Sequence, residues 1–156
     1  MKKEFDKTID YQKAKDKALS YLSFRAHSKK EIKEKLLRYG ATEDIICDVV
    51  DFLEEYKLIN EEDFALMYAK DLKNLKRYGE RRIKMELSKK GISPEIIENT
   101  LLELGDYDDS LLYELIKKRL KGDFDKKNKD RVIRYFITKG YELDEIKKNI
   151  SIIESE

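Results

Sequence analysis

The residues that could carry out acid–base, nucleophilic or metal chemistry are present, but their spacing does not build a catalytic site. His27 is the only histidine and Cys47 the only cysteine, which excludes a paired-histidine metal site and a disulfide within the chain. We interpret His27 as a surface residue and Cys47 as a small core residue. Carboxylate pairs such as Glu54 and Glu55 lie in acidic runs without the apolar surroundings that raise a pKa. No glycine-rich phosphate loop occurs, so we expect a protein that is not an enzyme and that holds no cofactor or metal.

Clustered cations are the chemistry that the sequence does supply. Segment 76–92 carries seven cations against two carboxylates, and segment 117–139 carries ten against three. Clustered Lys and Arg bind phosphates by releasing counterions, and such binding weakens steeply with salt. We predict that the first segment forms the main contact with a polyanion or a protein partner and that the second extends it. The predicted contact residues are Lys76, Arg77, Arg81, Arg82, Lys84, Lys89 and Lys90, extended by Arg131, Arg134 and Lys139.

Acidic segments alternate with the basic ones and bring the net charge to only +1. Segment 43–63 carries nine carboxylates and one lysine, and segment 95–114 carries seven carboxylates and no Lys or Arg. A second interpretation is therefore open, in which these runs are solvated faces or basic helices paired with neighbouring acidic ones. Four tyrosines lie among the cations, either to stack on bases or, as we favour, at the edges of an apolar core: Tyr39, Tyr78, Tyr135 and Tyr141.

Three glycines, Gly40, Gly91 and Gly140, organise these segments into a repeat. Apolar residues recur eight and four positions before each glycine, on one side of the helix that precedes it, and six, ten and thirteen positions after it, on one side of the helix that follows. They are Ile32, Leu36, Ile46, Val50 and Leu53, then Ile83, Leu87, Ile97, Leu101 and Leu104, then Val132, Phe136, Ile146, Ile150 and Ile153. We expect each glycine to end a basic helix in the left-handed conformation.

Local signals set the ends of the predicted helices. Ser28 with Glu31 three residues later forms a capping box at the start of the first basic helix. Gly79 and Asn128 occupy the offset of Ser28 in the second and third copies. Asn60 is expected to cap the helix that opens the second copy.

The fold class that follows is all-α, with three tandem three-helix repeats in an elongated array that can be curved. A single proline and only six glycines leave few places to break a helix. A leading helix is predicted in each copy, and its apolar residues, with Phe24 and Met67 among them, should close a small core. The predicted leading helices are 11–25, 61–75 and 108–120. We place an N-terminal tail at 1–10 and the repeats at 11–59, 60–105 and 106–156.

The sequence also predicts where the protein works. No apolar run approaches the roughly 18 residues of a membrane span, and the first residues lack the apolar segment of a signal peptide. We therefore expect a soluble, cytoplasmic protein without membrane contact, and we expect a monomer.

Three ordered motifs resemble the RecX family, the regulators of the RecA recombinase. Ala18-Leu-Ser-Tyr-Leu-Ser-Phe-Arg25 followed by Ser28-Lys-Lys-Glu31 is similar to the family pattern L..R..S..EL. Leu58-Ile-Asn-Glu-Glu-Asp-Phe-Ala65 is similar to glidDe.FA, and Tyr78-Gly-Glu-Arg-Arg-Ile-Lys-Met-Glu-Leu-Ser-Lys-Lys-Gly-Ile92 to G..RI..EL..KGI. The resemblance covers about residues 14–153. It is looser in the third copy, where Glu145 stands at the position of Ile45 and Ile96.

The resemblance implies three three-helix repeats and a regulator that lies in the groove of a RecA filament on single-stranded DNA. Most members of the family inhibit RecA by limiting filament extension, ATP hydrolysis and strand exchange, in the setting of homologous recombination, DNA repair and the SOS response. Reversing Arg81 and Arg82 to Glu is then expected to weaken filament binding without unfolding the protein. Two alternatives are a DNA-binding protein that acts alone, since three-helix units with a basic helix resemble helix-turn-helix modules, and an adaptor for another partner.

Overall fold

The structure, a computed structural model, describes residues 9–106 and 108–156. Within these residues the chain forms nine α-helices and no strand, which confirms the all-α prediction. They are α1 (Tyr11–Phe24), α2 (Lys29–Tyr39), α3 (Glu43–Glu55), α4 (Glu61–Asn74), α5 (Glu80–Lys89), α6 (Pro94–Leu104), α7 (Asp109–Leu120), α8 (Lys126–Thr138) and α9 (Leu143–Glu154). The predicted tail at 1–10 falls almost entirely on residues 1–8, which lie outside the described residues.

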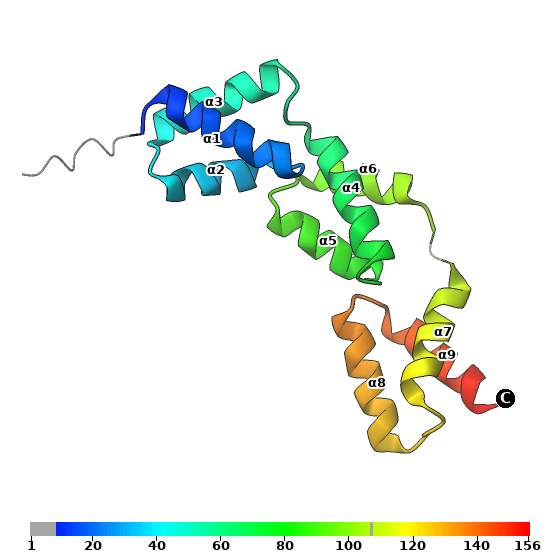
Figure 1. Cartoon of the computed structure of the whole chain (residues 1–156). Helices are drawn as coiled ribbons and strands as arrows, with labels where there is room; N and C mark the ends of the chain where they lie inside the picture. The colour runs from blue at the N-terminus through cyan, green and yellow to red at the C-terminus, as the bar shows by residue number, and fades with distance from the viewer. Residues whose placement is uncertain (1–8, 107) are drawn as a thin grey trace, which may run out of the picture.

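The helices follow one another as three bundles along an elongated, curved path (Figure 1). The main helix contacts lie within α1–α3, within α4–α6 and within α7–α9, which we call repeats 1, 2 and 3. Each repeat encloses an apolar cluster of its own, with Leu36, Leu87 and Phe136 at equivalent positions in the three clusters. The predicted array of three-helix repeats is therefore confirmed.

The three glycines that defined the repeat each end a helix in the left-handed conformation. Gly40, Gly91 and Gly140 have φ values of 113°, 81° and 103°. In each case the residue after the glycine donates its backbone N–H to a carbonyl five residues before it, at 3.0, 3.2 and 3.0 Å. This is the Schellman arrangement, which satisfies carbonyls that the end of a helix leaves free. Each of these turns reverses the chain, so that the next helix packs on the apolar cluster of the same repeat.

The predicted apolar positions around the glycines are buried, apart from Leu101 and Leu104, which are partly buried. Two residues of the leading helices are exposed instead, Phe24 at 86% and Met67 at 45%. Phe24 is the last residue of α1, beyond the part of that helix that faces the core. Met67 lies about half a turn away from the buried Ala65 and Ala69 of α4, so it points away from the core.

The helix starts follow the predicted caps in repeats 1 and 2. Ser28 and Glu31 form the capping box at the start of α2, and Asn60 caps α4. Helix α8 begins earlier than the offset of Asn128 predicts, because Asp125 is its N-cap. Asn128 thus lies inside the first turn of α8, where its side chain is free to bond the loop before the helix.

Candidate nucleic-acid interface

Most of the predicted contact residues on α5 are already engaged within the protein. Lys84 forms a salt bridge with Glu98, and Lys89 forms one with Glu86. Arg81, Arg82 and Lys90 contact neighbouring repeats. The structure thus separates the predicted contact surface into junction residues and residues that remain available to a ligand.

Lys90 belongs to the junction between repeats 1 and 2. Its Nζ lies 2.6 Å from Oε2 of Glu31 on α2, and Arg25 Nη2 donates to the same oxygen at 3.0 Å. The backbone N–H of Ser28 donates to the other oxygen, Oε1, at 3.0 Å. Burial alone would raise the pKa of Glu31, but these hydrogen bonds outweigh it and lower the pKa to about 2. Glu31 is therefore a charged bridge between α2 and the end of α5.

Arg81 and Arg82 belong to the junction between repeats 2 and 3. The amides of Gly79 and Arg81, at the start of α5, donate to the carbonyls of Lys139 and Gly140 at 2.7 and 3.3 Å. The start of one helix thus faces the end of another, with the helix dipoles in a favourable arrangement. The guanidiniums add to this contact, since Arg81 donates to the carbonyl of Tyr141 and Arg82 to that of Thr138, both at 2.9 Å.

This placement adds a second expected effect to the reversal of Arg81 and Arg82. Both side chains donate to backbone carbonyls of repeat 3, and the guanidinium of Arg82 also lies 4.4 Å from the ring centre of Tyr78. Carboxylates at these positions would face carbonyl oxygens and lose the hydrogen bonds. We therefore expect the double reversal to disturb the junction, so that it would not isolate a partner contact.

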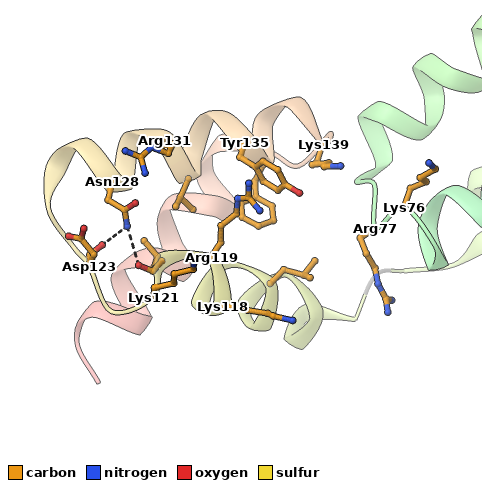
Figure 2. A pocket seen from close by; sticks show the side chains of 14 residues that line it. Lys76, Arg77, Lys118, Arg119, Lys121, Asp123, Asn128, Arg131, Tyr135 and Lys139 are labelled. Carbon is orange, nitrogen blue, oxygen red and sulfur yellow. Dashed lines mark hydrogen bonds between the residues drawn. The ribbon is translucent and has the colours of Figure 1, made fainter.

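Seven cations, four of them predicted contact residues, line a basic groove between α7 and α8, next to the turn that follows α4 (Figure 2). The groove has a volume of about 700 Å³ and is lined by seven cations and one carboxylate. Its floor is apolar, formed by Leu115, Leu120, Val132 and Phe136. Its charged residues are Lys76, Arg77, Lys118, Arg119, Lys121, Arg131, Lys139 and Asp123. Of the predicted contact residues, Lys76, Arg77, Arg131 and Lys139 line it, while Arg134 lies exposed on α8 outside the lining.

The groove cations have no salt bridge with any carboxylate of the described residues, in contrast to Arg82, Lys84, Lys89 and Lys90 of repeat 2. The single carboxylate of the lining, Asp123, accepts the backbone N–H of Asp125 at 3.0 Å. The positive charge of the groove is therefore not balanced by groups of its own. Such a site attracts phosphates or carboxylates of a partner.

Backbone geometry positions two of the cations. Arg77 and Lys121 have φ values of 59° and 53°, a left-handed conformation that side chains of L-residues rarely adopt. The hydroxyl of Tyr141 donates to the carbonyl of Arg77 at 2.8 Å and holds that turn from repeat 3. Asn128 Nδ2 donates to the carbonyls of Leu120 and Asp123 and holds the loop that contains Lys121 (Figure 2).

The ring of Tyr135 organises the wall formed by α8. The Arg119 guanidinium stacks on it, 3.3 Å from the ring centre, and Lys139 Nζ lies 5.3 Å from the same centre (Figure 2). Tyr135 also packs against the apolar cluster of repeat 3, as the core-edge interpretation of the tyrosines predicts. It serves as core residue and cation platform at once.

Sequence reasoning missed Lys118, Arg119 and Lys121 as members of the site. They lie in the basic segment 117–139, so the charge count was the available signal. What the sequence could not supply is that the end of α7 faces α8 across the groove. That arrangement depends on the tight turn at Lys121 and Gly122 and on the bonds of Asn128.

The structure overturns two further interpretations. His27 is buried, with 3% of its surface exposed, and it lies in the turn between α1 and α2. Its Nδ1 is 2.9 Å from the carbonyl of Arg25 and its Nε2 is 2.8 Å from Lys35 Nζ, while burial lowers its pKa. Cys47 is exposed, because the core-facing side of α3 runs through Ile46, Val49, Val50 and Leu53.

Neither a metal site nor a membrane span emerges from the described part of the chain. No three His, Cys, Asp or Glu side chains there are grouped to hold a metal ion. None of its helices combines the length and the apolar character needed to cross a bilayer.

The comparison with known proteins points to one family. Residues 14–53 match the model of the first three-helix domain of RecX, and residues 60–101 match that of the second. The Regulatory protein RecX of Clostridium perfringens strain SM101 is 31% identical over 150 residues, which cover 91% of this chain and 69% of that protein. The RecX of Prosthecochloris aestuarii is 30% identical over 145 residues, covering 90% of this chain and 93% of that protein.

Solved structures give the same result. The crystal structure of RecX from Lactobacillus salivarius superposes with a TM-score of 0.73 at 30% identity, covering 94% of this chain and 98% of that one. The likeness thus extends over all three repeats of the array. This chain belongs to the RecX family of regulatory proteins.

Proposed function

We propose that this chain binds the RecA filament on single-stranded DNA and inhibits the ATP hydrolysis, filament extension and strand exchange of RecA. Membership of a family of regulatory proteins supports the regulatory part of this proposal. The basic groove supports the proposed contact with the filament, because its seven cations have no salt bridge within the described residues. The protein acts in the cytoplasm as a monomer and performs no chemistry itself.

The shape of the array supports a mode of action. A curved row of three repeats can follow the surface of a helical filament and touch more than one protomer (Figure 1). If the chain binds across protomers, its affinity for the filament depends on the spacing of the RecA protomers, so the array favours one filament geometry over others. A filament held in one geometry hydrolyses ATP and extends more slowly. The basic groove between α7 and α8 anchors repeat 3 in this arrangement, and Lys76 and Arg77 add repeat 2.

The test is a titration of the DNA-dependent ATPase of RecA with the wild-type chain and with charge-reversal variants. Lys118→Glu combined with Arg131→Glu removes two groove cations that form no salt bridge within the described residues. Lys147→Glu on α9 is a control for a single charge reversal at another site, because Lys147 is exposed and lies outside the groove. Circular dichroism and thermal melts check that each variant is folded.

We expect the wild type and Lys147→Glu to lower the ATPase alike, and the double variant to require about tenfold more protein or more, equivalent to about 1.4 kcal/mol of binding free energy. An ATPase that no amount of wild-type protein changes would overturn the proposed function. Equal inhibition by the double variant would overturn the assignment of the groove as the contact surface.

A further inference from the structure

We propose that the basic groove binds the phosphodiester backbone of single-stranded DNA directly, and that the bound strand bridges repeats 2 and 3. This inference rests on the proposed function and deepens it, because it names the DNA strand, and not the protein surface of RecA, as what the groove contacts.

The charge of the groove fits a row of phosphates. The lining takes its cations from the turn after α4, from the end of α7 and from α8, so three separate segments contribute positive charge to the groove. Asp123 is the only carboxylate among the described residues of the lining, and one of its oxygens already accepts the N–H of Asp125. A patch built for an acidic protein surface needs cations only where isolated carboxylates meet it. A phosphodiester chain instead places one negative charge at every nucleotide.

Arg119 is arranged in advance for a phosphate. Its guanidinium stacks on Tyr135, 3.3 Å from the ring centre, which restricts its rotamers before any ligand arrives. A planar guanidinium can donate two parallel hydrogen bonds to phosphate oxygens, and stacking leaves its edge free for them. Less conformational entropy is then lost on binding than for a freely moving arginine.

The shape of the groove favours a single strand over a duplex. It is a concave space of about 700 Å³ between two helices, with an apolar floor that includes Leu115 and Val132. A flexible strand can enter such a space and place sugars or bases against the floor, where stacking and apolar contact add to the charge interaction. Double-stranded DNA is stiff over about 150 base pairs, so it can touch only the rim.

The walls of the groove come from two repeats that are joined at its edge. Arg77 belongs to repeat 2, yet its carbonyl accepts the hydroxyl of Tyr141 at 2.8 Å. Lys139 belongs to repeat 3, and its carbonyl accepts the amide of Gly79 at 2.7 Å. A strand held by Arg77 and Lys139 together therefore crosses the junction and stabilises it.

The experiment measures, by fluorescence anisotropy and without RecA, how tightly the full chain binds a fluorescein-labelled oligothymidylate of 12 nucleotides. The measurement is repeated across a salt series. The variants are Lys118→Ala combined with Arg131→Ala, and Lys147→Ala as control. Contact with three to five phosphates predicts a slope of log K against log salt of about −2 to −3.5 for the wild type. We expect at least tenfold weaker binding and a shallower slope for the double variant, and affinity within twofold of wild type for the control.

Three outcomes would overturn the inference. They are wild-type affinity of the double variant for the oligonucleotide, tighter binding to a 12-base-pair duplex than to the single strand, and displacement of the strand by inorganic tripolyphosphate at equal phosphate concentration. Failure here is distinguishable from failure of the proposed function. The wild-type chain could fail to bind the free strand while Lys118→Glu with Arg131→Glu still abolishes ATPase inhibition. That pair of results would mean that RecA protein occupies the groove, and the regulatory function would stand.

Discussion

Lys90 and Arg131 both lie in strongly basic segments, yet they have different roles because their neighbours differ. Lys90 Nζ is 2.6 Å from a buried carboxylate oxygen of Glu31, whereas Arg131 lines the groove without a salt bridge in the described part of the chain. The charge of Lys90 is paired with Glu31 in the salt bridge that joins repeats 1 and 2. The charge of Arg131 remains available to a ligand.

At this scale we predict that Glu31→Gln lowers the free energy of unfolding by about 2 kcal/mol, the size expected for hydrogen bonds to a charged group. Glutamine keeps the shape and can still accept the N–H of Ser28, but it loses the charge that faces Arg25 and Lys90. Urea unfolding at pH 7 measures the effect. Glu34→Gln on the exposed side of α2 is the control, and equal stability of the two variants would show that the bridge contributes nothing.

The same substitution has a defined pH dependence. The pKa of Glu31 is about 2 in the folded protein, below its usual value of 4.5, so its stabilising effect is present above about pH 4.5. It is lost as the pH falls from about 4.5 towards 2. The stability difference between wild type and Glu31→Gln should therefore be full at pH 7 and much smaller at pH 2.5. A difference that does not change with pH would contradict the charged state of Glu31.

At the scale of elements, the two junctions use the same parts of the repeat in different ways. The start of α2 meets the end of α5 through side chains, chiefly Glu31 with Lys90 and Lys30 Nζ with the carbonyl of Lys89. The start of α5 meets the end of α8 through backbone hydrogen bonds, and this is possible because Gly79 and Gly140 bring the two backbones together.

We predict that Gly79→Ala opens the junction between repeats 2 and 3. The φ of Gly79 is −79°, which alanine adopts without strain, but a Cβ there would lie 2.5 Å from the carbonyl oxygen of Gly140. Backbone cannot give way cheaply, so we expect a loss of about 1–3 kcal/mol, as for overpacking. Small-angle scattering should show a larger maximum dimension than in the wild type.

Gly122→Ala is the control for this prediction. No atom lies within 4 Å of a Cβ at Gly122, although its φ of 74° adds backbone strain of about 1 kcal/mol. It should lower stability without changing the dimensions of the array. If Gly79→Ala leaves both dimensions and stability at wild-type values, the close approach of Gly79 and Gly140 is not required.

Helix positions were largely predictable because their signals are local. Gly40, Gly91 and Gly140 need a left-handed conformation, and Ser28 and Asn60 satisfy the first amides of their helices, so each acts within a few residues. The start of α8 departed from the offset rule because Asp125 supplied an earlier cap.

At the scale of the whole molecule, the array was predictable from the repeat but the groove was not. Its cations are far apart in sequence, from Lys76 to Lys139, and their meeting depends on how repeat 3 is set against repeat 2. We predicted segment 76–92 as the main contact from the sequence, but a count of charges could not reveal that Arg81, Arg82 and Lys90 are used in junctions. Long-range packing decides which side chains of a basic segment are available.

Regulation of the RecA filament through the basic groove can be tested by comparing binding of this chain to RecA-coated and to bare single-stranded DNA, each across a salt series. We predict at least tenfold tighter binding to the coated strand. We also predict that Lys118→Glu with Arg131→Glu weakens that binding and makes its salt dependence shallower, while Lys147→Glu does not. Equal affinity for coated and bare DNA, with no difference between the groove variant and the control, would contradict both predictions.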